Sequence, residues 1–146
     1  MTVERLARHT ILCTCLIGAL ETAGCGRSYH VAEVDGQLLA HGQPASKVKI
    51  QFLPDIDRGS RGPVSTAETD ATGHFKLQWK ERGEDTAQPG AVVGWHRVVL
   101  SDMKLAESET GRGVPIRFGA EYTQPGSTPL RQEVKEGKQT IEITVP

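Results

Sequence analysis

The stretch Thr69–Leu77 constrains the fold of this chain more than any other part of the sequence. Asp70 can hydrogen-bond the backbone two residues ahead, and Gly73 accepts the positive φ that a tight turn requires. From Phe75 to Trp79 apolar and polar residues then alternate, which is the period of a half-buried strand. The stretch therefore predicts a strand end, a tight turn and a new strand.

Runs of the same period recur along the chain between segments rich in glycine and proline. The clearest places Val48, Ile50 and Phe52 on one face, and Pro54 ends it because proline lacks a ladder donor. Extended segments are expected at 31–39, 47–52, 64–69, 75–79, 95–101, 130–134 and 139–145. About seven strands separated by turn signals predict an all-β domain, a β-sandwich.

The segments between these runs carry weaker expectations. The polar strand 64–69 is expected near a sheet edge, and Asp35-Gly36 predicts a bend or a bulge in the first strand. The ranges 80–90 and 102–113 are predicted to be loops, and we expect no helix after the N-terminal segment.

The length and net charge of the chain bear on the number of domains and on the kind of partner. The chain has 146 residues, which indicates one domain, and its formal net charge is −1. A nucleic-acid partner is not expected, because such proteins carry a basic face.

The N-terminal 24 residues have the order of a secretory signal. Arg5 and Arg8 precede the apolar run Ile11–Leu20, and the small residues Ala23-Gly24 follow. The run is too short to span a bilayer, which takes roughly 20 residues. The alternative is a buried N-terminal helix, although no polar stripe accompanies the apolar residues.

The chain has three cysteines, and only Cys25 lies after the apolar run. Cys13 and Cys15 lie in the apolar run and leave with it, so Cys25 remains alone and no intramolecular disulfide is expected. Thr22-Ala23-Gly24-Cys25 resembles the lipobox of bacterial lipoproteins, with threonine where leucine is usual. The resemblance implies cleavage before Cys25 and a diacylglycerol with chains such as palmitate on it. The alternative is an ordinary signal peptide that leaves a free thiol.

These observations divide the chain into a signal at 1–24, a tether at 25–30 and a β domain at 31–146. The residues from Gly26 to His30 span at most roughly 20 Å, so an anchored domain would lie close to the membrane. The expected location is the cell envelope of a bacterium, at the periplasmic or outer-membrane face. Gly26 in place of an acidic residue favours the outer membrane by resemblance to lipoprotein sorting signals.

The β domain resembles transthyretin-like, carboxypeptidase-regulatory-like sandwiches. The resemblance rests on Val34–Leu38, Gly42-Gln43-Pro44, Val48–Pro54, Thr69–Phe75 and Gly90–Val98, in this order. Val114-Pro115-Ile116, Tyr122 and Leu130–Val145 also resemble the tail of small exported lipoproteins that carry this domain. It implies a seven-stranded prealbumin-like sandwich, a fold that commonly acts as a non-catalytic accessory or binding module. His96 stands where this group usually has tyrosine, and we expect a partly buried, hydrogen-bonded histidine there.

Trp95 and Arg97 are the candidate ligand contacts. An exposed tryptophan on a sheet can stack on a sugar or anchor a protein, so the expected partner is an envelope protein or a glycan. The alternative is that Trp95 covers the flank of the sandwich with Arg97 beside it.

Metal and cofactor sites are not expected. The histidines and Cys25 lack the short spacings of a metal site. Asp55-Ile56-Asp57 resembles the start of a calcium loop only faintly, because Arg58 follows, and a solvated loop is expected.

Catalysis is not expected either. The chain contains no Gly-x-Ser-x-Gly elbow. Transthyretin-like folds include hydroxyisourate hydrolase, which is the enzymatic alternative. Its C-terminal tyrosine-arginine-glycine-serine motif is absent, since this chain ends Ile143-Thr144-Val145-Pro146. The sequence thus predicts an exported, lipid-anchored β-sandwich with a structural or binding role.

Overall fold

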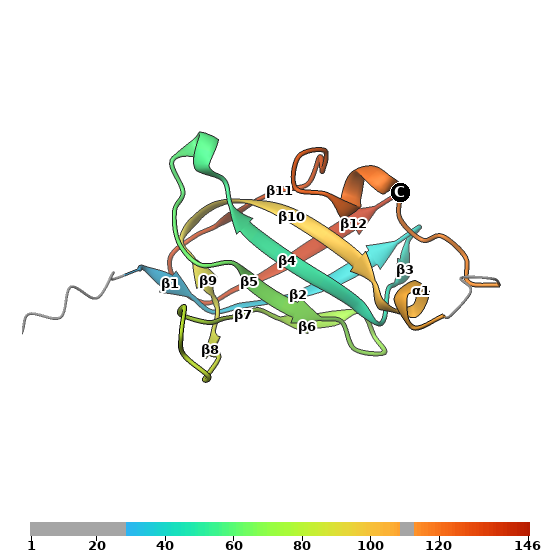
Figure 1. The fold of residues 1–146 in the computed structure, drawn as a ribbon, viewed down its shortest axis with the longest axis horizontal. Helices are drawn as coiled ribbons and strands as arrows, with labels where there is room; N and C mark the ends of the chain where they lie inside the picture. The colour runs from blue at the N-terminus through green and yellow to red at the C-terminus, as the bar shows by residue number, and fades with distance from the viewer. Residues whose placement is uncertain (1–28, 109–112) are drawn as a thin grey trace, which may run out of the picture.

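The computed structural model describes residues 29–108 and 113–146, and these are mostly β structure (Figure 1). The strands are β1 (Val31–Ala32), β2 (Val34–Ala40), β3 (Gln43–Pro44), β4 (Val48–Pro54), β5 (Ser65–Glu68), β6 (His74–Lys76), β7 (Gln78–Trp79), β8 (Gln88–Pro89), β9 (Ala91–Val92), β10 (Gly94–Asp102), β11 (Arg131–Val134) and β12 (Gln139–Val145). The helical segments are α1 (Met103–Glu107) and the 3-10 turns η1 (Ile56–Arg58) and η2 (Ala120–Thr123). The all-β expectation is confirmed.

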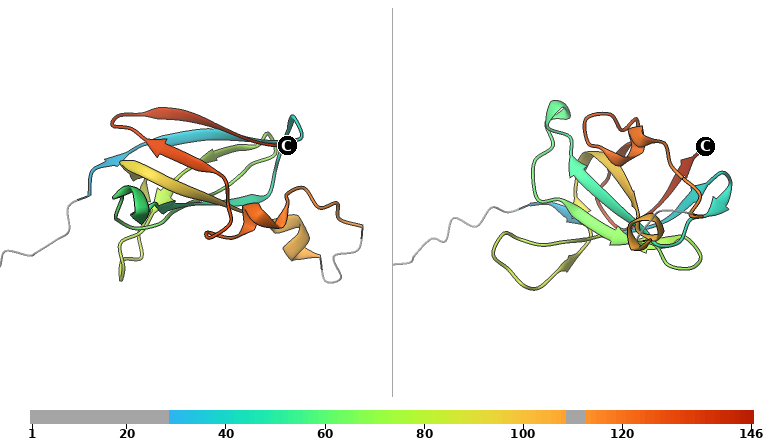
Figure 2. Two further views of the ribbon diagram at one scale, coloured as in Figure 1. Left: turned by 90° about the horizontal axis from the view of Figure 1, so that it is seen from above. Right: turned by 45° about the vertical axis from the view of Figure 1, so that its right-hand side comes forward.

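The strands form two larger sheets that lie face to face (Figure 2). The six-stranded sheet has the order β11-β10-β4-β5-β7-β8. In the other sheet β2 is central, with β12 parallel to it on one side and β3 and β6 antiparallel on the other. A short pair, β1 with β9, stands apart from both.

The core lies between the sheets, where the alternation in the sequence predicts it. Val48, Ile50 and Phe52 of β4 are 0 % exposed. On β12 the apolar residues at alternate positions are buried, and polar residues between them are exposed. Because a strand sends successive side chains to opposite faces, the period of two fixes which residues enter the core.

The turn after β5 is built as the sequence predicts. The Asp70 carboxylate accepts hydrogen bonds from the backbone N–H groups of Thr72 (2.8 Å) and His74 (3.0 Å). Gly73 has φ +76°, in the region that favours glycine.

The strands on either side of this turn do not continue as an ordinary hairpin. β5 belongs to the six-stranded sheet, whereas β6 pairs with β2 in the other sheet. The chain returns to the first sheet at Leu77, whose N–H donates to Val34 O (3.0 Å) and whose carbonyl accepts from Gly90 N–H (2.7 Å). The run from Phe75 to Trp79 therefore pairs with strands of both sheets.

Several local expectations are wrong. β5 lies between β4 and β7 and is no edge strand; its outward side chains are polar because that face of the sheet meets solvent. Asp35-Gly36 lies within β2 and makes no bend, and Gln88–Pro89 in the predicted loop 80–90 forms β8.

The helix α1 was not expected, and its N-cap explains it. The Asp102 carboxylate accepts from the N–H groups of Lys104 (3.0 Å) and Leu105 (3.4 Å). The Arg117 guanidinium also binds Asp102, donates from Nη1 to Ser46 O (2.8 Å), and ties the segment after α1 to this end of the sheet. Burial is the largest single influence on the Asp102 carboxyl and raises its pKa. The hydrogen bonds and positive charge of Arg117, together with the hydrogen bonds from the N–H groups of Leu105 and Lys104, outweigh burial, so the pKa lies below its usual value.

No helix within residues 29–108 or 113–146 is long and apolar enough to cross a membrane.

Candidate functional site: an open groove and an arginine-rich flank

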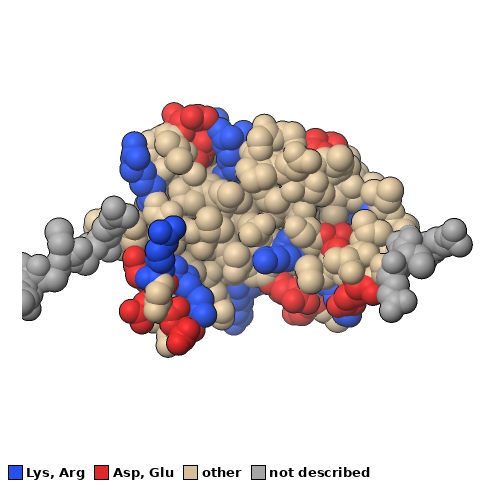
Figure 3. Space-filling view, in the orientation of Figure 1, with Lys and Arg blue, Asp and Glu red and all other residues tan. Residues whose placement is uncertain are grey.

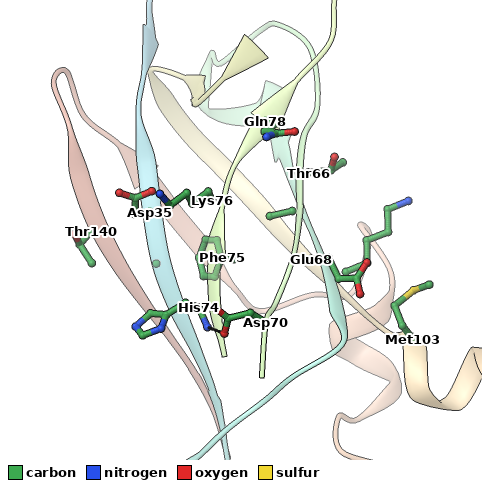
Figure 4. A pocket seen from close by; sticks show the side chains of 13 residues that line it. Asp35, Thr66, Glu68, Asp70, His74, Phe75, Lys76, Gln78, Met103 and Thr140 are labelled. Carbon is green, nitrogen blue, oxygen red and sulfur yellow. Dashed lines mark hydrogen bonds between the residues drawn. The ribbon is translucent and has the colours of Figure 1, made fainter. Parts of the chain in front are cut away.

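The largest hollow that we describe is a groove where β5 and β6 diverge into different sheets (Figure 4). It has a volume of about 860 Å³. Phe75, Ala67, Gly36 and Met103 provide its apolar part. The polar rim comprises Asp35, Lys49, Thr66, Glu68, Asp70, His74, Lys76, Gln78 and Thr140.

The charges on the rim are arranged in opposite-sign neighbours. Lys76 on β6 lies directly across from Asp35 on β2, and Lys49 on β4 lies across from Glu68 on β5. Opposite charges at such cross-strand positions attract each other and leave little net field. The groove therefore offers hydrogen bonds and apolar contact, and its rim carries one carboxylate, Asp70, beyond these two pairs.

One end of the groove holds a compact network of Asp70, Thr72 and His74. Thr72 Oγ1 lies 2.7 Å from Asp70 Oδ1 and 2.8 Å from His74 Nδ1. The hydrogen bond from the Thr72 hydroxyl is the main cause that lowers the pKa of Asp70. In a catalytic triad the carboxylate orients the histidine, and the histidine acts as base on the hydroxyl. Here the Asp70 carboxylate contacts the Thr72 hydroxyl directly. The network stabilises the turn and lacks the order of a catalytic triad.

The candidate contacts Trp95 and Arg97 lie two residues apart on β10, and both are engaged by the loop that follows β4. The Arg58 guanidinium carbon lies 4.2 Å from the centre of the Trp95 ring, which is the geometry of a cation–π contact. Arg97 binds Asp57 and donates from Nε to Asp55 Oδ1 (3.2 Å). The structure brings the two residues together, with both side chains already in contact with charged neighbours.

Asp55 is the centre of this flank, and the expectation of a solvated loop is wrong for it. Its side chain is 3 % exposed and lies within 4.0 Å of three guanidinium groups, at 3.2 Å from Arg97, 3.4 Å from Arg131 and 3.9 Å from Arg58. A buried carboxylate is tolerated when charged partners surround it in this way. We name Asp55, Asp57, Arg58, Arg97 and Arg131 the Asp55 cluster.

The sequence gives no signal for this cluster. Asp55 and Arg97 are 42 residues apart, and only strand pairing between β4 and β10 brings them together. Burial of Asp55 is likewise a consequence of the sheet and has no counterpart in local spacing.

Three further expectations concern groups elsewhere. Cys25, the candidate lipid site, lies outside the described residues. Within the described ranges no three His, Cys, Asp or Glu side chains are placed to hold a metal ion. His96, expected to be partly buried, is 0 % exposed, and its Nδ1 lies 3.0 Å from Gly94 O.

Comparison with protein-family models, with curated proteins and with solved structures finds no match to this chain.

Proposed function

We propose that this chain is an exported, lipid-anchored β-sandwich protein with a non-catalytic binding or structural role at the bacterial cell envelope. The observation that carries the proposal is the order of the first 25 residues. Two arginines, an apolar run of about ten residues and Ala23-Gly24-Cys25 precede a β domain whose first strand begins at Val31. A lipid at Cys25 would hold that domain at a membrane, which is the proposed first partner.

The fold we propose is the prealbumin-like sandwich that the sequence resembles. Of the twelve strands in the part of the chain that the structure describes, five are only two residues long, and the longer ones are β2, β4, β5, β6, β10, β11 and β12. Their two sheets enclose one core. Seven principal strands in two layers agree with the seven-stranded fold; a structure solved by experiment and compared strand by strand with transthyretin tests this assignment.

The anchor is tested with a pair of cysteine variants. Cys25→Ala should release the protein from the membrane fraction, because it removes the acylated residue. Cys13→Ala is the matched control and should leave fractionation unchanged, since Cys13 lies in the segment that is cut away. The intact mass of the membrane-extracted protein should equal residues 25–146 plus a diacylglycerol. Membrane association that is the same in both variants would refute the anchor.

A binding role is supported by the groove between β5 and β6. Its apolar base and mixed polar rim suit an extended peptide, which presents alternating side chains and backbone hydrogen-bonding groups. Charge reversal at Glu68 (Glu68→Lys) should weaken cross-linking to an envelope protein. Glu107→Lys on α1, which lies outside the groove, should not.

The carbohydrate-binding alternative uses Trp95 and has less support. Arg58 covers one face of the ring, so a sugar would have to displace it. Quenching of tryptophan fluorescence by a glycan, made stronger by Arg58→Ala, would favour this alternative. The hydroxyisourate hydrolase alternative has the least support, because the C-terminal motif of that family is absent. Hydrolysis of hydroxyisourate by the purified protein would establish it.

A further inference from the structure

Exposed and half-buried apolar side chains gather at the end of β4, beside Tyr29. Tyr29, Leu53, Pro54, Ile56 and Val64 line a shallow hollow of about 790 Å³, and Arg61 and Gly62 complete it. Ile56 is 66 % exposed and Val64 is 40 % exposed. We call these five apolar residues the β4-end patch.

The exposure of Ile56 is fixed by the fold around it. Ile56 is the first residue of η1, and the carboxylates on either side of it both bind Arg97. Ser60, after η1, accepts a hydrogen bond from Trp95 N–H (2.7 Å). The loop is thus tied to β10 at several points while its isoleucine points outward. Large exposed apolar side chains held in this way commonly mark a contact surface.

The position of the patch identifies its occupant. Tyr29 is both a member of the patch and the fourth residue after Cys25. Whatever path the chain takes, four residues span at most about 14 Å. A lipid on Cys25 would therefore hold this end of the domain against the membrane. We propose that the β4-end patch docks on the lipid surface and orients the domain; this inference rests on the proposed lipid anchor.

The chemistry around the patch agrees with a lipid interface. Arg58 and Arg61 lie beside it, and cationic side chains are attracted to anionic headgroups. Tyr29 is a residue type enriched where protein meets headgroups. Figure 3 shows Lys and Arg atoms at the end that carries β1 and η1, with acidic atoms among them. Asp57 of η1 binds Arg97, and the loop between β7 and β8, which Figure 1 shows at the same end as β1, contains Glu81, Glu84 and Asp85.

Ile116 is an exposed isoleucine at the other end of the domain, and it serves as the control for Ile56. It is 78 % exposed, and its neighbour Arg117 binds Ser46 and Asp102. Asp102 pairs with Val48, the first residue of β4, whereas Ile56 follows the last residue of that strand. The two isoleucines are thus both exposed and lie at opposite ends of β4.

The experiment labels each position with a fluorophore that responds to water. Ile56→Cys and Ile116→Cys are introduced separately into the full chain, and the mature protein is extracted from membranes. Its intact mass is recorded to establish the lipid. The labelled proteins are placed in vesicles of phosphatidylethanolamine and phosphatidylglycerol. Quenching by a water-soluble quencher is compared before and after the protein is placed in the vesicles. We expect it to fall roughly threefold or more at position 56, as at an interfacial segment, and to stay unchanged at position 116.

The outcomes separate the two proposals. A lipidated protein quenched equally at both positions would overturn the docking inference and leave the anchor intact. A mature protein without the lipid mass would refute the anchor and the inference together. Shielding of position 56 that rises with protein density on the vesicles would assign the patch to a second copy of the chain, and would also overturn the inference.

Discussion

Phe75 lies directly across from Gly36 in the antiparallel pair of β6 and β2, and its ring occupies the space that a side chain at position 36 would need. A β-carbon at Gly36 would fall within 3.0 Å of the Phe75 ring and of the Ile141 carbonyl oxygen. The close approach of three strands therefore depends on glycine at this position. This contact packs β6, the strand with which the chain crosses from the first sheet to the second, against β2 at the centre of the second sheet.

Gly36→Ala should lower the free energy of unfolding by about 3 kcal/mol, because a well-packed core must shift to admit the methyl group. Urea unfolding measures the change. Gly126→Ala is the control, since its β-carbon meets nothing within 4 Å, and it should alter stability by less than about 0.5 kcal/mol. Phe75→Leu in the Gly36→Ala background should recover only part of the loss, because the Ile141 carbonyl remains. Equal stability of the two alanine variants would contradict the packing described.

The sequence predicts those features of the fold that depend on neighbouring residues. The alternation at Val48, Ile50 and Phe52 and the turn chemistry of Asp70 and Gly73 are local, and the structure confirms both. Periodicity and turn preferences act over a few residues, so they are visible without knowledge of strand pairing.

Features that depend on strand pairing could not be predicted. The strand run after Gly73 has one period but serves two sheets, because β6 pairs with β2 and β7 with β5. The central place of β5 follows from its pairing with β4 and β7, and the Asp55 cluster follows from the pairing of β10 with β4 and β11. Of the candidate site, the sequence singled out Trp95 and Arg97 as candidates, but it predicted neither the groove nor the burial of Asp55, whose partners are distant along the chain.

Ser65 in β5 and Thr69 just after β5 each carry a buried hydroxyl group. Removal of these two groups should affect the free energy of unfolding differently. Thr69 Oγ1 accepts a hydrogen bond from Val48 N–H (2.9 Å) in a buried position, so Thr69→Val should cost about 1–3 kcal/mol by leaving that N–H unpaired. Ser65 Oγ is buried and has no hydrogen-bond partner among the described residues. Ser65→Ala should therefore change stability by less than about 0.5 kcal/mol or increase it. Thermal unfolding of the two variants measures the difference, and a larger loss for Ser65→Ala would contradict the prediction.

Asp55 should contribute more to stability than its neighbour Asp57. Asp55→Ala leaves the guanidinium groups of Arg97 and Arg131 without their buried partner, and we expect a loss of about 2–4 kcal/mol, since these arginines are partly exposed. Asp57 has a side chain 78 % exposed, so Asp57→Ala should cost less than about 1 kcal/mol. Chemical denaturation at neutral pH tests both. If the two losses are equal, the Asp55 cluster does not hold the loop.

The burial of His96 should make stability depend on pH. Burial lowers the pKa of His96, although the Gly94 carbonyl and the charge of Asp55 act in the opposite direction. In the unfolded chain this histidine takes up a proton near its ordinary pKa of 6.5, while in the folded protein it does so only at lower pH. Between these two values the unfolded state binds more protons, so stability falls as the pH is lowered and is fully present above about pH 7.5. One such group changes the free energy of unfolding by at most about 1.4 kcal/mol per pH unit. Urea midpoints between pH 5 and pH 8 should show this slope in the wild type.

His96→Phe separates this effect from the titration of other groups. The ring is of similar size and cannot take up a proton, so the stability lost between pH 7 and pH 5 should be smaller than in the wild type. The comparison concerns the slope alone, because loss of the hydrogen bond to Gly94 lowers stability at every pH. His74→Phe, at an exposed position on the rim of the groove, is the control for the replacement of a histidine by phenylalanine. An unchanged slope in His96→Phe would show that His96 is not the group responsible, and that its charged form is accommodated within the core.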